Sequence, residues 1–72
     1  MNEGMLWFDD DKKVDLRHKL ERAVGYFKQK YGYCPSQCII HPSMLSNEDL
    51  NNNGVKVHTS SYVLPYHFWL EF

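Results

Sequence analysis

Apolar residues in the first half of the chain recur every three to four positions, the spacing of a helix with one buried face. This pattern predicts a long helix from about Asp11 to Tyr31. Asp9 or Asp10 is the expected N-terminal cap, because a carboxylate there accepts hydrogen bonds from free N–H groups. Gly32 is the expected C-terminal stop, since glycine readily adopts the left-handed conformation. The apolar stripe consists of Leu16, Leu20, Ala23, Val24, Phe27 and Tyr31.

Four other segments have the composition and alternation of strands. Pro42 ends the second of these segments, Gln37–His41. It can start a short helix within residues 43–50, followed by a turn at residues 51–54. Pro65 interrupts the last strand. Because proline cannot donate to a strand ladder, that strand is expected at a sheet edge or with a bulge. The predicted strands are Met5–Phe8, Gln37–His41, Val55–Thr59 and Tyr62–Phe72.

These elements predict a single α+β domain over residues 1–72, with one long N-terminal helix packed on a small, mostly antiparallel sheet of three to four strands. In the last strand, even-numbered residues such as Phe68 and Leu70 point to one face, which should meet the helix. Trp69 points to the other face, which a single helix cannot also cover. Gly25, inside the helix, is expected to allow close approach of a strand.

The composition is that of a folded protein, because 43% of the 72 residues are hydrophobic, 15% are aromatic and the net charge is −1. The longest apolar run is about four residues, whereas a membrane-spanning helix needs about 20. The acidic N-terminus lacks the features of a signal peptide. We therefore expect a cytoplasmic protein with no membrane contact, no cofactor, and cysteines present as thiols.

The predicted helix is strongly basic, which makes nucleic-acid binding one alternative function. Its segment Lys12–Tyr31 has a formal charge of +5, from seven basic and two acidic residues, and the remainder of the chain sums to −6. The basic residues are mixed with Asp15 and Glu21, a pattern typical of a solvated helix face. A pI near 6.4 also disfavours a nucleic-acid module. The candidate contacts are Lys13, Arg17 and Lys28, with Trp69 stacking on bases.

A second alternative is a metal-stabilised fold, since thiolate and imidazole are the usual zinc ligands. The candidates are Cys34, Cys38 and His41, but Cys38 lies inside an apolar strand and is better explained as a small core residue. Cys34 or Ser43 could also serve as a nucleophile beside His41. No nucleophile motif surrounds them, and His41 before Pro42 is better explained as a local cap. We therefore expect the protein not to be an enzyme.

Aromatic residues at the C-terminal end exceed what a core of this size can bury. Exposed apolar patches commonly mark interfaces, and Trp and Tyr are enriched in interface hot spots. The favoured prediction is therefore a non-catalytic interaction module of unknown biological role that forms a homodimer through its C-terminal strand, or contacts another protein. The predicted interface residues are Trp7, Tyr62, Tyr66 and Trp69.

The passage from Tyr26 to Pro35, followed by Ile39 to Ser43, resembles a helix–loop–strand passage of phage-type capsid proteins. There too, a helix precedes an apolar strand that ends in a His-Pro or Asn-Pro step. The passage covers less than a quarter of the chain, which is far too short for a capsid protomer, so the resemblance implies no function.

Overall fold

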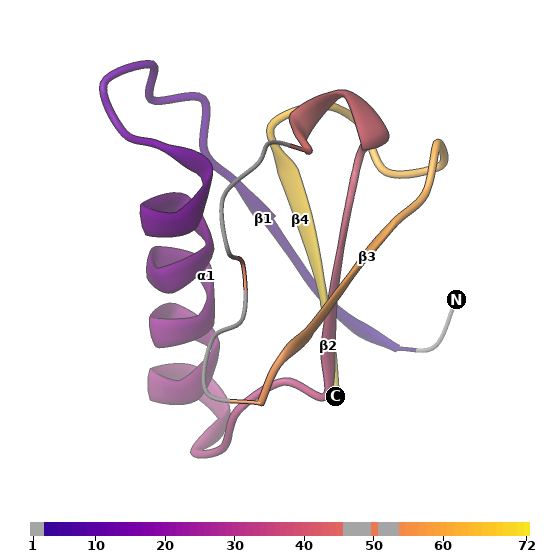
Figure 1. Ribbon diagram of the computed structural model, residues 1–72. Coiled ribbons are helices and arrows are strands. Elements are labelled where there is room, and N and C mark those ends of the chain that lie inside the picture. The colour runs from indigo at the N-terminus through magenta and orange to yellow at the C-terminus, as the bar shows by residue number, and fades with distance from the viewer. Residues whose placement is uncertain (1–2, 46–49, 51–53) are drawn as a thin grey trace.

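The chain forms one helix layer against one sheet layer (Figure 1). The computed structural model describes residues 3–45, 50 and 54–72. The predicted helix residues 46–49 and the predicted turn residues 51–53 lie outside this described part. The elements in chain order are β1 (Gly4–Phe8), α1 (Leu16–Tyr31), β2 (Gln37–Ile40), the 3-10 turn η1 (Pro42–Met44), β3 (Lys56–Thr59) and β4 (His67–Glu71).

The sheet has the strand order β1-β4-β2-β3. β4 pairs antiparallel with both β1 and β2, whereas β2 and β3 run parallel. The predicted α+β class with a mostly antiparallel sheet is therefore confirmed. The expected edge position of the C-terminal strand is wrong, because β4 lies between two partners. Pro65 does not interrupt this strand, since β4 begins two residues later at His67.

The helix begins later than its charge pattern suggests. Asp15 is the N-cap, and its side chain accepts a hydrogen bond of 2.9 Å from the His18 N–H. The predicted start at Asp11 is wrong because Asp11 forms a turn of its own. Its side chain accepts from the Lys13 N–H at 3.0 Å, and its carbonyl accepts from the Val14 N–H at 3.3 Å. Short acidic side chains compete in this way with helical hydrogen bonds.

The helix ends at the predicted glycine. Gly32 adopts a left-handed φ of 83° and donates its N–H to the Lys28 carbonyl at 2.8 Å. This geometry is a common helix stop that β-branched and bulky residues tolerate poorly. Gly25, by contrast, is exposed and has no atom within 4 Å of where a Cβ would lie. The expected close approach of a strand at Gly25 is therefore wrong.

The core lies between α1 and one face of the sheet. Phe68 and Leu70 of β4 are fully buried there, as the alternation predicts. From the helix, the predicted stripe contributes five buried residues, with Tyr31 packed at the margin. The largest fully buried side chains are Phe27, Phe68, Leu20, Ile40, Leu70 and Cys38. Within the described residues, no helix is both long and apolar enough to cross a membrane.

Candidate interaction surface

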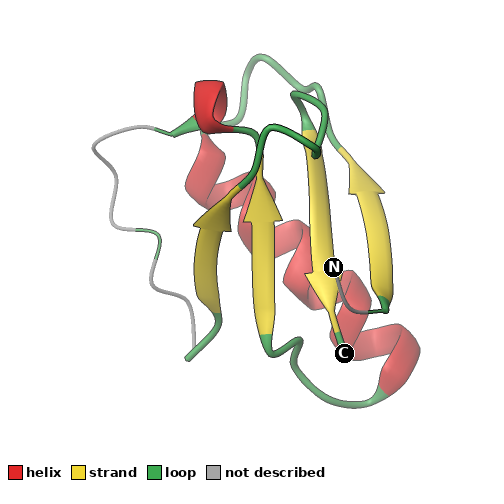
Figure 2. Cartoon of the chain, turned by 90° about the vertical axis from the view of Figure 1, so that its right-hand side faces the viewer, coloured by secondary structure: helices red, strands yellow, loops and turns green. Residues whose placement is uncertain are grey.

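In the part of the chain that the structure describes, one face of the sheet has no helix packed on it. Figure 2 views the molecule from this side, with the four strands in front and α1 behind them. The strand register places residues of this open face in three rows across the sheet, because paired residues point the same way. The first row is Gly4, Glu71, Gln37 and Lys56; the second is Leu6, Trp69, Ile39 and His58; the third is Phe8 and His67. We call these ten residues the open face.

The open face changes character along the strands. Its first row is polar, whereas its second row has Leu6, Trp69 and Ile39 side by side. In the third row, the Phe8 and His67 rings contact each other with centroids 4.9 Å apart. His67 Nδ1 also donates to the Pro65 carbonyl at 2.9 Å, which fixes the ring against the preceding loop. The apolar part of the face therefore begins at the middle row and extends toward this loop.

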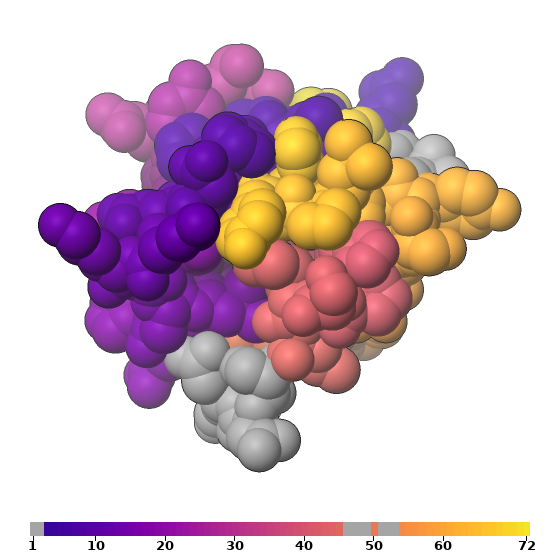
Figure 3. All heavy atoms as spheres, turned by 90° about the horizontal axis from the view of Figure 1, so that it is seen from above, coloured from indigo at the N-terminus to yellow at the C-terminus, as the bar shows by residue number. Residues whose placement is uncertain are grey.

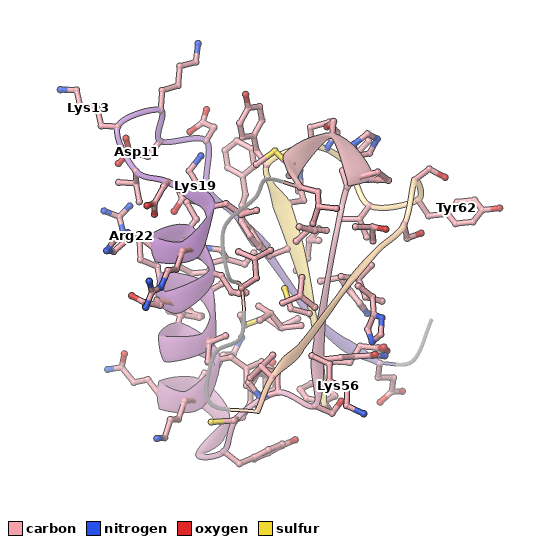
Figure 4. All side chains as sticks on the ribbon, in the orientation of Figure 1. Asp11, Lys13, Lys19, Arg22, Lys56 and Tyr62 are labelled. Atoms are coloured by element: carbon pink, nitrogen blue, oxygen red, sulfur yellow. The ribbon has the colours of Figure 1, made fainter. Side chains whose placement is uncertain are left out.

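A groove of about 280 Å³ lies between the loop and the apolar part of the open face. The loop supplies Tyr62, Val63 and Leu64, and the strands supply Leu6, His67 and Trp69. Val63 is buried, but three of the lining side chains are highly exposed: Tyr62 at 88%, Leu64 at 64% and Leu6 at 57%. Tyr62 projects away from the helix layer in Figure 4. Such a concentration of exposed apolar side chains commonly marks an interface.

Two polar atoms of the open face lack hydrogen-bond partners within the described structure. Trp69 Nε1 and Glu71 Oε2 are both buried, and neither has a partner there. The other carboxylate oxygen of Glu71 accepts from the Gln37 side-chain amide. Lys56 lies beyond Gln37 in the same row. A buried donor without an acceptor costs free energy, so the surroundings of Trp69 are incompletely satisfied in the monomer.

The four predicted interface residues divide between the two sides of the sheet. Tyr62 and Trp69 lie at the groove on the open side. Trp7 pairs with Phe68 on the helix-facing side, and its ring lies 4.8 Å from the Tyr26 ring of α1. Tyr66 adopts a left-handed φ of 64°. Its ring lies 5.1 Å from Lys19 Nζ, a cation–π contact with a buried helix residue.

The prediction omitted Leu6, Phe8 and Leu64, all of which are exposed on or beside the open face. Alternation within residues 5–8 carries the signal for the first two. Once Met5 is assigned to the core, Leu6 and Phe8 must point to the opposite face. Leu64 lies in a loop, where no periodic pattern indicates the direction of a side chain.

The two arginines of α1 lie close to acidic partners. Arg17 is 3.8 Å from Glu21, and Arg22 lies 3.5 Å from both Asp9 and Asp11. Lys13 and Lys28 are exposed, the first before the helix and the second in its last turn. Lys13, Asp11 and Arg22 gather at one end of the helix in Figure 4. Among the described residues, acidic side chains therefore interrupt the positive charge at the start of this helix, which does not favour the binding of phosphates there.

The three candidate metal ligands do not converge. Cys38 faces the core from β2, Cys34 precedes this strand, and His41 follows it. Because a strand rises about 3.3 Å per residue, Cys34 and His41 lie near opposite ends of it. Burial also raises the pKa of the Cys38 thiol to about 12, which disfavours the thiolate that a metal needs. No cluster of three or more potential ligands occurs within the described residues.

His41 forms a local cap, as predicted. Its Nδ1 accepts a 3.0 Å hydrogen bond from the Ser43 N–H and lies 2.7 Å from Ser43 Oγ, so the ring caps η1. Figure 3 shows η1 grouped with residues around 9–15 and 60–67 at the end of the molecule seen from above. The short Ser43–His41 distance is explained by the turn itself, since the two residues are two positions apart.

No protein-family model, curated protein or solved structure matches this chain.

Proposed function

We propose that this protein is a non-catalytic interaction module that forms a homodimer through the open face. The observation that carries the proposal is the row of Leu6, Trp69 and Ile39, flanked by a groove whose rim side chains are more than half exposed. Within the described residues, no helix covers this row. Ile39 is already buried, with an exposure of 8%, and Trp69 is half-buried, so packing against a second sheet, as in a β-sandwich, would cover mainly Leu6, the remaining surface of Trp69 and the groove rim.

A second copy suits this face because the apolar row runs across the middle of it. A twofold axis between two stacked sheets can run along the strands or across them. Either axis, passing over the centre of the face, brings the middle row of one copy onto the middle row of the other. Trp69 then contacts apolar side chains of the partner in both arrangements, which is the self-complementarity that an isologous dimer requires.

We propose the cytoplasm as the compartment in which the module acts, where Cys34 and Cys38 would remain thiols. Alkylation in intact cells before lysis should modify the partly exposed Cys34. Protection of Cys34 that reducing agent removes would contradict this placement.

Light scattering over a dilution series tests the dimer. We expect the wild-type mass to fall from two chains to one on dilution, and Trp69→Ala to remain a monomer throughout. Leu64→Glu, at the groove rim, should also weaken the dimer, since it would bury a charge in an apolar contact. Leu45→Glu is the matched control, because Leu45 is similarly exposed at 58% but does not line the groove. A wild-type monomer at every concentration would overturn the proposal.

A further inference from the structure

A second surface of the sheet is the outer side of β1, whose free peptide groups lie at the sheet edge and not on the open face. β1 is the terminal strand in the order β1-β4-β2-β3, and Figure 2 shows it at one edge of the sheet. Within the described residues, β4 is its only strand partner. An edge strand presents free N–H and C=O groups that can pair with another chain.

Hydrogen bonds at the two ends of β1 identify which peptide groups face outward. The Asp9 N–H donates to the Tyr66 carbonyl at 2.9 Å, and the Phe72 N–H donates to the Glu3 carbonyl at 3.2 Å. In an antiparallel pair, residues that bond to the neighbouring strand alternate with residues that do not. Odd-numbered residues of β1 therefore bond to β4, and Gly4, Leu6 and Phe8 direct their N–H and C=O groups away from the sheet.

β1 lacks the features that normally prevent strand addition. Its sequence, Gly-Met-Leu-Trp-Phe, contains no charge and no proline. Proteins commonly protect exposed edges with lysine, proline or a bulge. Leu6 and Phe8 are also 57% and 55% exposed, so an added strand would gain apolar contacts beside the free peptide groups.

The charges at the ends of β1 indicate which chain can pair there. Glu3 precedes the strand, and Asp9 and Asp10 follow it. If a second copy paired antiparallel over the whole strand, Leu6 would lie opposite its own equivalent, and Glu3 would lie opposite Asp9 and beside Asp10 of that copy. Arg22 lies 3.5 Å from Asp9 and offsets part of its charge, whereas Asp10 is exposed. Like charges so close across a strand pair are destabilising, and this contact would occur twice. The acidic ends therefore disfavour a second copy and match a strand with basic ends.

We propose that the outer edge of β1 binds an extended segment of another protein, which adds to the sheet as a fifth strand. The bound segment has alternating apolar residues flanked at both ends by lysine or arginine. Its backbone pairs with Leu6 and Phe8, and its basic ends lie near Glu3 and Asp10, both exposed. The site uses the edge of the sheet, so it does not depend on dimerisation through the open face.

A synthetic peptide, acetyl-Lys-Thr-Val-Thr-Val-Thr-Lys-amide, is a suitable probe. Amide hydrogen exchange measured by NMR should be fast for Leu6 and Phe8 in the free protein and slow for Met5 and Trp7. Added peptide should slow exchange at Leu6 and Phe8 in a saturable way. A peptide with glutamate in place of both lysines should bind about tenfold more weakly, since each end exchanges an attraction for a repulsion.

Leu6→Pro tests the backbone pairing directly, because it removes an outward N–H without removing a bond to β4. It should abolish peptide binding, whereas Leu6→Thr, which keeps the N–H, should retain it. Should Leu6→Pro not fold, the two peptides still decide the matter on the wild-type protein. Equal binding of both peptides, or no change at Leu6 and Phe8 with either, would overturn the proposal. In Trp69→Ala, which should not dimerise through the open face, protection of Leu6 and Phe8 that grows with protein concentration alone would overturn it in favour of a second copy.

Discussion

Trp69 lies directly opposite Leu6 across the β1–β4 pair, on the sheet face away from α1. The other tryptophan, Trp7, pairs with Phe68 on the opposite face and contacts Tyr26 of the helix. The two indoles therefore report separately on the two faces of one sheet.

Single-tryptophan variants should distinguish these faces. In Trp7→Phe, where Trp69 remains, dilution of the proposed dimer should shift the fluorescence emission to longer wavelength, because Trp69 becomes hydrated. In Trp69→Phe, where Trp7 remains, the emission should not change with concentration. A concentration-dependent shift in Trp69→Phe instead would place the interface on the helix side.

Replacing the helix N-cap should lower stability. Asp15→Ala removes the acceptor of the His18 N–H and should reduce the free energy of unfolding by about 1 kcal/mol. Asp15→Ser should retain most of the wild-type stability, since serine also caps helices. Asp10→Ala is the control, because Asp10 is exposed and outside the helix. Urea denaturation measures all three, and a larger effect at Asp10 than at Asp15 would contradict the assigned cap.

Substituting the two glycines of the helix region should have opposite effects. Gly25→Ala should raise the free energy of unfolding by about 0.5–1 kcal/mol, because the added Cβ meets no atom and alanine favours the helix. Gly32→Ala should lower it by about 1 kcal/mol, since alanine must adopt a left-handed φ. Thermal and urea unfolding of both variants provide the check. Destabilisation by Gly25→Ala would mean that the helix has a close neighbour there.

Stability should fall in alkaline solution because of Cys38. Burial raises the pKa of its thiol from 9.0 to about 12, so above pH 9 the unfolded chain loses this proton before the folded chain does. The contribution of the protonated Cys38 thiol to the free energy of unfolding is complete below pH 9. It is lost as the pH rises toward about 12. Between about pH 7 and pH 10 the loss from this thiol is about 1 kcal/mol.

Cys38→Ala supplies the comparison, because it removes this titration and leaves the other groups unchanged. The difference in unfolding free energy between wild type and Cys38→Ala should narrow as the pH rises. A difference that stays constant to about pH 10 would show that the thiol does not titrate differently on folding.

The helix and the two sides of β4 could be predicted from the sequence because they depend on local periodicity. Leu16, Leu20 and Phe27 repeat at the helical spacing, and Phe68 alternates with Trp69. The predicted start of the helix is wrong because several aspartates could cap it. Only the structure shows that Asp11 forms a separate turn before the helix.

The position of β4 could not be predicted, because strand order depends on pairing between segments that are distant in the chain. The same limit applies to the candidate surface. Trp7 shares the helix-facing side with Met5, as alternation within β1 indicates. Tyr66 lies in the loop before β4, where no alternation indicates its side, and its contact with Lys19 places it toward the helix. Composition identified an excess of aromatic residues without showing which of them share a face.

The inner position of β4 has a consequence for how the molecule folds. β4 is the element that joins β1 to the β2–β3 pair, so without it the sheet consists of two unconnected parts. β1 gains its strand partner only when Gly4 pairs with Glu71. This pairing closes a loop that contains nearly the whole chain. Contacts between such distant residues are slow to form, and few stable intermediates are available before this one forms. Folding should therefore be a single cooperative step, with the docking of β4 as its latest requirement.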